Sequence, residues 1–238
     1  VSVFEFSSIH TYILQYIYIH TMQLSVSILL LILIHPTHTQ KRNRFAILSV
    51  ATVDYVEKHA LGISSKECYA MKDESTDFVL HIPSERELEE SDRSPHWIRV
   101  QVLNDTLPYY DWIFYTDVDT FLTNPNVRLQ TFVEIAERKA SSPPFLIVQD
   151  GMEINSGGFF IRNTQASFNF LQEWWDMYEQ SKNWRFARTT YDQVPFFLTM
   201  LRFAYRGLNV PYDGECETRY WQSYGMVLAC WNSAMSNI

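Results

Sequence analysis

Residues 111–125, with the sequence DWIFYTDVDTFLTNP, constrain the fold more than any other part of this chain. The run from Trp112 to Thr116 consists mainly of aromatic and β-branched residues, which is typical of a strand buried in the middle of an α/β sheet. Two carboxylates, Asp117 and Asp119, follow directly. Because open α/β sheets bind ligands at the carboxyl ends of their strands, the sequence predicts a binding site here.

The two aspartates predict a metal site. In an extended chain successive side chains alternate, so Asp117 and Asp119 should point the same way and Val118 should face the other side. Two close carboxylates are unfavourable unless one is protonated or a cation lies between them. Mn²⁺ or Mg²⁺ suits oxygen ligands and leaves its other positions to water and substrate phosphates. The pattern favours a nucleotide diphosphate as ligand, and the alternative is an ordinary turn after a strand.

Strands and helices alternate around this segment. Apolar runs predict strands at residues 45–51, 77–82, 112–116 and 145–148. Periodicity predicts helical or turn structure within 55–71 and helices at 95–107, 127–140, 166–180 and from about 191 onward. The charged run 84–93 is predicted to be a solvated loop. The alternation predicts an α/β fold with a mainly parallel central sheet flanked by helices.

Composition limits the class of protein. The chain has 238 residues, of which 47% are hydrophobic, so it can build a substantial core in one or at most two domains. Its net charge is −8 and it has no basic run, which excludes nucleic acid as an expected partner.

The first 40 residues differ from the rest. They contain one charged residue, Glu5, and an apolar block from Leu24 to Ile34 that is short for a membrane span but fits the core of a signal peptide. We expect a signal peptide or membrane anchor in residues 1–40, with Met22 as initiator and mis-annotated sequence up to residue 21. The alternative is a buried core helix. Residues 41–238 are expected to form a single domain.

Two features bear on a secretory location. Asn104-Asp105-Thr106 is an N-glycosylation sequon. The cysteines are Cys68, Cys216 and Cys230, and both a Cys216–Cys230 disulfide and free thiols stay open.

Two further polar segments follow the central strand. Asn155 and Ser156 offer hydrogen bonds, and the adjacent Gly157-Gly158 would let a polar ligand lie against the backbone. Asp192-Gln193 begins a helix, where Asp192 is either a site residue or an N-terminal capping acid.

The order and spacing of these motifs resemble the galactosyl/xylosyl/mannosyl transferase family, known from fungal Golgi mannan enzymes and plant xyloglucan xylosyltransferases. The resemblance extends from about Phe45 to Arg206 and includes Pro95-His96-Trp97. It implies a GT-A type, Rossmann-like nucleotide-binding domain that uses Mn²⁺ and a UDP- or GDP-sugar and retains anomeric configuration. It also implies a glycan or glycoprotein acceptor and a membrane-anchored place in the Golgi lumen.

The resemblance assigns Asp117 and Asp119 to the donor and the metal. Arg99 lies near the position where the family usually has a lysine, so it would reach the donor phosphates. The alternative for Arg99 is a solvated surface arginine.

The resemblance assigns the remaining motif residues to the sugars. Asn155, Ser156 and Gly157 would contact the transferred sugar or the acceptor. Asp192 would lie beside the anomeric carbon as hydrogen-bond acceptor or nucleophile, and Gln193 would stabilise an oxocarbenium-like centre.

The sequence departs from the family pattern in two ways. The family usually completes its metal site with a histidine near the C-terminus, whereas the last histidine here is His96. We therefore expect that the chain lacks its last elements, uses another ligand or is inactive. Two consecutive acids commonly precede the glutamine, whereas here Tyr191 precedes Asp192.

Three functions remain open. The favoured one is a metal-dependent retaining glycosyltransferase. The second is an inactive glycosyltransferase-like binding protein. The third is a phosphohydrolase with an aspartyl nucleophile, against which Phe121 argues because those enzymes need Thr or Val at that position.

Overall fold

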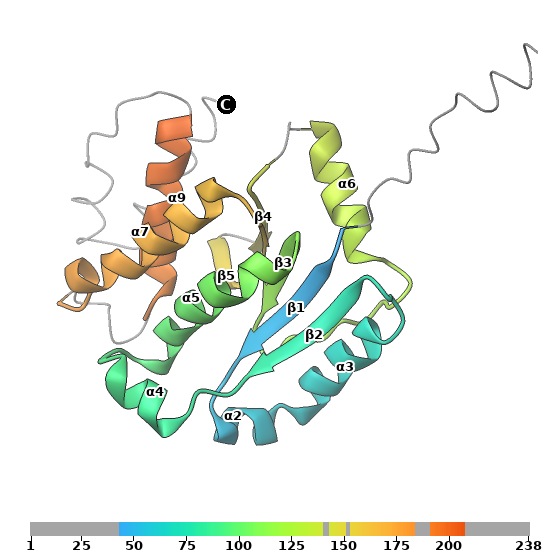
Figure 1. Ribbon diagram of the computed structural model, residues 1–238, viewed down its shortest axis with the longest axis horizontal. Helices are drawn as coiled ribbons and strands as arrows, with labels where there is room; N and C mark the ends of the chain where they lie inside the picture. The colour runs from blue at the N-terminus through green and yellow to red at the C-terminus, as the bar shows by residue number, and fades with distance from the viewer. Residues whose placement is uncertain (1–42, 140–142, 151–152, 184–190, 208–238) are drawn as a thin grey trace, which may run out of the picture. The chain divides into compact units, whose positions relative to one another are not determined.

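The structure is a computed structural model that describes residues 43–139, 143–150, 153–183 and 191–207. Five strands form one sheet in the order β2-β1-β3-β5-β4 (Figure 1). The strands are β1 (Phe45–Val50), β2 (Thr76–His81), β3 (Trp112–Thr116), β4 (Phe145–Asp150) and β5 (Glu153–Arg162). β1 pairs in parallel with β2 and β3, whereas β5 pairs antiparallel with β3 and β4. Four strands thus run in one direction, which confirms the predicted α/β fold with a mainly parallel sheet.

The helices agree with the predicted periodicity except at one place. They are α2 (Val53–Lys58), α3 (Ala60–Ala70), α4 (Glu85–Glu90), α5 (Pro95–Thr106), α6 (Leu129–Lys139), α7 (Gln165–Ser181) and α9 (Gln193–Gly207), with a short 3₁₀ helix η1 (Leu107–Tyr109) after α5. The helical or turn structure predicted within 55–71 forms the two helices α2 and α3, which meet at His59.

The solvated loop predicted for residues 84–93 is wrong, because this segment contains α4. Ser84 and Glu87 form a capping box, in which the Ser84 N–H donates to the Glu87 carboxylate at 2.8 Å and the Glu87 N–H donates to Ser84 Oγ at 3.2 Å. Arg86 and Glu90 pair one turn apart at 2.7 Å. No residue of α4 is buried, so the helix leaves no apolar stripe in the sequence, and its capping signature was the one available signal.

One face of the sheet packs against α5, α7 and α9 (Figure 1). The sheet residues on this face are Ala46, Leu48, Ile113, Tyr115, Phe159 and Ile161. Phe159 contacts Phe196 of α9 and Trp174 of α7, with ring centroids 5.0 and 6.2 Å apart. Phe170 and Trp174 of α7 are fully buried in this core.

The opposite face packs against α3 and α6. Its buried residues are Phe45, Ile47, Trp112 and Phe160 from the sheet, Tyr69 from α3, and Leu129 and Val133 from α6. Burial of both faces explains why the central strands have continuous apolar sequences.

Several sequence predictions fall outside the described residues. The leader expected in residues 1–40 and the pair Cys216 and Cys230 lie there. Cys68 is described and is an exposed free thiol. Among the described helices, none is long and apolar enough to cross a membrane.

Candidate functional site

A cavity of about 270 Å³ lies at the carboxyl ends of β1 and β3. The end of β1 and the residues after it, the start of α5, and the end of β3 line it. The lining residues are Val50, Ala51, Thr52, Tyr55, Pro83, Pro95, His96, Arg99, Tyr115, Asp117, Val118 and Asp119. Asp117 and Asp119 therefore face one space at the sheet edge where ligands of open α/β folds bind.

The aspartates lie in a turn, so the extended conformation expected for them is wrong. The strand ends at Thr116, and the Thr120 N–H donates to the Asp117 carbonyl at 3.1 Å. Val118 between them is only 3% exposed. The Asp117 side chain is 44% exposed and Asp119 is exposed. A turn thus brings both carboxylates to the cavity, where an extended strand was expected to do so.

Gly157 makes room for the Asp117 carboxylate. A Cβ atom at residue 157 would lie 2.3 Å from Asp117 Oδ2 and 2.9 Å from Asn155 Oδ1. The Gly157 N–H donates to Asn155 Oδ1 at 2.7 Å, and the Gly157 carbonyl accepts the Asp117 N–H at 3.0 Å. Close backbone approach was predicted for this glycine, and the group that approaches it in the structure is a carboxylate of the chain itself.

Arg99 lies at the centre of a buried polar cluster. Its Nε donates to Asp192 Oδ2, and its other nitrogens reach Ser156 Oγ at 2.9 Å and the Ser156 carbonyl at 3.2 Å. Asp117 Oδ1 lies 3.4 Å away and the Tyr115 hydroxyl 3.5 Å away. The Arg99 side chain is only 6% exposed, so the alternative of a solvated surface arginine is wrong.

The ionisable groups of this cluster shift one another's pKa values. Burial alone would lower the pKa of Arg99, but Asp192, Tyr115 and Asp117 more than offset it and raise that pKa, so the guanidinium stays charged. Burial raises the pKa of Asp192, and Arg99 opposes that shift. Burial also raises the pKa of Tyr115, so its hydroxyl keeps its proton and donates it to Asp117 Oδ1 at 3.1 Å.

Asp192 directly precedes α9, so it lies at the N-terminus of that helix as expected. Its carbonyl accepts the Phe196 N–H at 2.9 Å, the first hydrogen bond of the helix, and also accepts Trp174 Nε1 at 3.2 Å. Its carboxylate pairs with Arg99 and the residue is 2% exposed. Gln193, the first residue of α9, is half-buried.

The predicted sugar-contacting residues do not line this cavity. Asn155, Ser156, Gly157, Asp192 and Gln193 are not among the residues that line the cavity in the described part of the chain. Ser156 is 2% exposed and its hydroxyl is bound to Arg99. The structure thus brings Asp117, Asp119 and Arg99 together at the cavity and connects Ser156 and Asp192 to them through Arg99.

His96 lines the cavity, although its sequence motif assigned it no role there. Its ring stacks on Tyr191, with centroids 4.1 Å apart and an interplanar angle of 21°. Burial lowers its pKa, partly opposed by Asp192, which favours the neutral imidazole. Pro95 at the start of α5 places His96 in the first turn of that helix, and this was the available signal.

The donor set fits a hard cation that shares its coordination with a ligand. Across residues 43–207, excluding the undescribed gaps, no group of three or more His, Cys, Asp or Glu residues could hold a metal ion by itself. Two carboxylates at an open cavity suit Mg²⁺ or Mn²⁺, which usually bind proteins through one or two carboxylates together with substrate phosphates.

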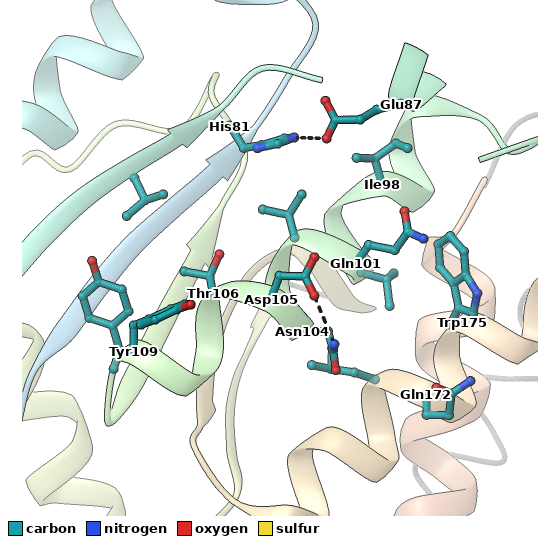
Figure 2. Close-up of a pocket in the computed structure, with 15 residues that line it drawn as sticks. His81, Glu87, Ile98, Gln101, Asn104, Asp105, Thr106, Tyr109, Gln172 and Trp175 are labelled. Atoms are coloured by element: carbon teal, nitrogen blue, oxygen red, sulfur yellow. Dashed lines mark hydrogen bonds and ion pairs between the residues drawn. The ribbon is translucent and has the colours of Figure 1, made fainter. Parts of the chain in front are cut away.

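A larger cavity of about 620 Å³ lies elsewhere, between β2, α4, α5 and α7 (Figure 2). Figure 2 shows His81 directed at Glu87 and Asn104 at Asp105, with Trp175 and Gln172 on the α7 side. None of its described lining residues is Lys or Arg. Because diphosphates are bound by cations, the smaller cavity, with Arg99 and the two aspartates, is the better candidate for a nucleotide donor.

Comparison with known proteins gives one similar curated sequence. No family model matches the chain. The probable alpha-1,6-mannosyltransferase MNN10 of Saccharomyces cerevisiae is 28% identical over a match that covers 50% of this chain. The chain is similar to the MNN10-like glycosyltransferases. The match spans 37% of the length of that relative.

Solved structures also match, among them a glycosyltransferase. The crystal structure of a glycosyltransferase involved in the glycosylation of the major capsid of PBCV-1 is 17% identical, with a TM-score of 0.46. The match covers 63% of this chain and 72% of that one.

Proposed function

We propose that this chain is a glycosyltransferase that moves a sugar from a nucleotide-diphosphate sugar to a glycan or glycoprotein. The observation that carries the proposal is the pair Asp117 and Asp119 on a cavity at the carboxyl ends of β1 and β3. The similarity of half the chain to a mannosyltransferase supports a hexose as the transferred sugar.

The proposal includes a divalent cation, Mn²⁺ or Mg²⁺, held by Asp117 and Asp119. Bound there with the donor, such an ion would supply electrostatic stabilisation of the departing diphosphate. Arg99 adds a permanent positive charge 3.4 Å behind Asp117. Because this charge is buried, its field is less screened than that of a surface arginine.

The finer parts of the proposal concern stereochemistry and location. We extend it to retention of anomeric configuration, a UDP- or GDP-sugar donor and a site of action in the secretory pathway, all of which follow from the family resemblance. Asp192 and Gln193 remain proposed catalytic residues. The burial of Asp192 and its bond to Arg99 support a role through Arg99 more than direct contact with the sugar.

A thermal-shift measurement tests the donor site. A ligand that binds only the folded state raises the melting temperature, so the full chain is heated with UDP, GDP and their sugars, with and without Mn²⁺. We expect a shift that requires Mn²⁺ and is lost in Asp119→Asn. Asp105→Asn is the matched control, because Asp105 lies in the larger cavity.

Two outcomes would overturn the proposal. If no nucleotide shifts the melting temperature of the well-folded protein, or if Asp119→Asn binds as well as the wild type, the donor site is not at the aspartates. Metal-dependent binding without sugar transfer to any glycan would favour the inactive binding protein. Release of phosphate from phosphomonoesters would favour the phosphohydrolase.

A further inference from the structure

Lys66 is a buried cation that is bonded to the aspartate turn and is not among the described residues lining the cavity. It belongs to α3, its exposed fraction is 0%, and its ammonium donates to three carbonyls. The acceptors are Thr120 at 2.7 Å, Val118 at 3.2 Å and Gly62 at 3.3 Å. A lysine ammonium has three donors, so all of them are used here. Lysine is almost never fully buried unless it is paired in this way.

Gly62 allows α3 to approach the turn closely enough for these bonds. A Cβ atom at residue 62 would lie 2.2 Å from the Val118 carbonyl oxygen and 3.3 Å from that of Thr120. Gly62 and Lys66 are four residues apart and therefore lie on one face of α3. Ser65 adds another contact, because its Oγ accepts the Leu122 N–H at 3.3 Å.

These contacts fix the peptide groups on both sides of Asp119. The carbonyls of Val118 and Thr120 are held toward α3, while the Thr120 N–H closes the turn onto Asp117. With the backbone bound from one side, the Asp119 side chain remains exposed on the cavity side. Burial lowers the pKa of Lys66 to about 8, and Asp119 and Asp117 oppose that shift, so the ammonium also lies within the electrostatic reach of both carboxylates.

We propose that Lys66 is a positioning residue, which holds the turn 117–120 in the conformation that presents Asp119 to the cavity and thereby sets the affinity for a metal–nucleotide complex. The affinity part rests on the proposed function, because it assumes that Asp117 and Asp119 bind the metal. Holding of the turn is a separate property that can be measured without any ligand.

The test uses the full chain and Lys66→Met, which keeps a side chain of similar length without donors or charge. Hydrogen exchange of the Thr120 and Leu122 amides reports on the turn directly. We expect both amides to exchange at least tenfold faster in the variant, and the dissociation constant of the Mn²⁺–UDP or Mn²⁺–GDP complex to rise at least tenfold.

Two variants separate positioning from general loss of stability. Val133→Ala removes buried side-chain volume from the core beside α6, so it should lower the melting temperature and leave the binding constant within twofold. Gly62→Ala is the second variant if Lys66→Met does not fold. Its Cβ would displace the Val118 carbonyl, and we expect weaker binding from a folded protein.

Wild-type exchange at Thr120 and Leu122 in folded Lys66→Met would overturn the proposal, as would wild-type affinity in both Lys66→Met and Gly62→Ala. If the wild-type protein binds no metal–nucleotide complex at all, the proposed function and the affinity role fail together. Exchange at the two amides then still decides whether Lys66 holds the turn.

Discussion

The ion pair between Arg99 and Asp192 gives the sharpest prediction about stability. The two side chains are 6% and 2% exposed, and Asp192→Asn keeps the shape of the side chain while removing its charge. Removing one partner of a buried pair costs about 3–5 kcal/mol, because the other charge is left without compensation. Asp117, 3.4 Å from Arg99, and the two oxygens of Ser156 remain as partners. We therefore expect a cost near the lower end, about 3 kcal/mol.

The comparison with Asp117→Asn tests whether burial causes this cost. Asp117 contacts the same guanidinium, but its side chain is 44% exposed and water can replace the lost interaction. Partly exposed ion pairs contribute about 1 kcal/mol or less. The double variant Arg99→Met with Asp192→Asn removes both charges, so it should cost less than the sum of the single variants by about 2 kcal/mol.

The assay is urea unfolding of the full chain at neutral pH for the wild type, the three single variants and the double variant. Total stabilities of domains are about 5–15 kcal/mol, so a loss of about 3 kcal/mol shifts the midpoint clearly. A cost below about 1 kcal/mol for Asp192→Asn, or additive effects in the double variant, would refute the buried ion pair. Sugar transfer by Asp192→Asn also has to be assayed well below the melting temperature of that variant, so that unfolding is not taken for lost catalysis.

Three further predictions follow from the site. Gly157→Ala should lower the free energy of unfolding by about 1–3 kcal/mol and weaken metal binding, because its Cβ would lie 2.3 Å from Asp117 Oδ2. Gly158→Ala is the control, since its Cβ meets nothing within 4 Å. Both variants are measured by urea unfolding and by Mn²⁺ titration. Since the folded state lowers the pKa of His96, the wild type should lose stability as the pH falls below about 6.5, and His96→Phe should lose less over the same melting series. The pKa of Lys66 falls from 10.5 to about 8 on folding, so between these pH values the unfolded chain binds more protons than the folded one. The wild type should therefore gain stability relative to Lys66→Met as the pH rises through this range. Equal slopes of unfolding free energy against pH for the two proteins would contradict this.

Elements with a strong local signal were predicted well. The apolar run Trp112–Thr116 is β3 with the same bounds. The predicted strand 45–51 is one residue longer than β1, and the predicted strand 77–82 is shifted by one residue from β2. The central strands β1 and β3 are almost continuously apolar because helices cover both faces of the sheet. Strand β5 was not predicted, because Asn155-Ser156-Gly157-Gly158 interrupts its apolar pattern. Its antiparallel direction depends on how the chain returns to the sheet and leaves no mark in a single strand.

Charged residues were harder to place. The sequence left two roles open for Arg99, a ligand of the donor phosphates or a surface residue. It gave no prediction for Lys66. The sequence shows the charge of such a residue but not the carbonyls and carboxylates that surround it. For Arg99 these come from β5, from the residue after β3 and from the residue before α9. For Lys66 they come from α3 and from the turn after β3.

The sequence by itself determined the strand that ends in two aspartates, the order of the helices and strands apart from α4 and β5, and the resemblance to a glycosyltransferase family. These follow from periodicity and spacing, which act along the chain. The tertiary structure alone decided that Asp117 and Asp119 meet in a turn, that Arg99 and Asp192 form a buried pair, and that Lys66 holds the turn backbone. Burial and ion pairing depend on which elements pack together, because a charge is stable away from water only where distant parts of the chain supply its partners.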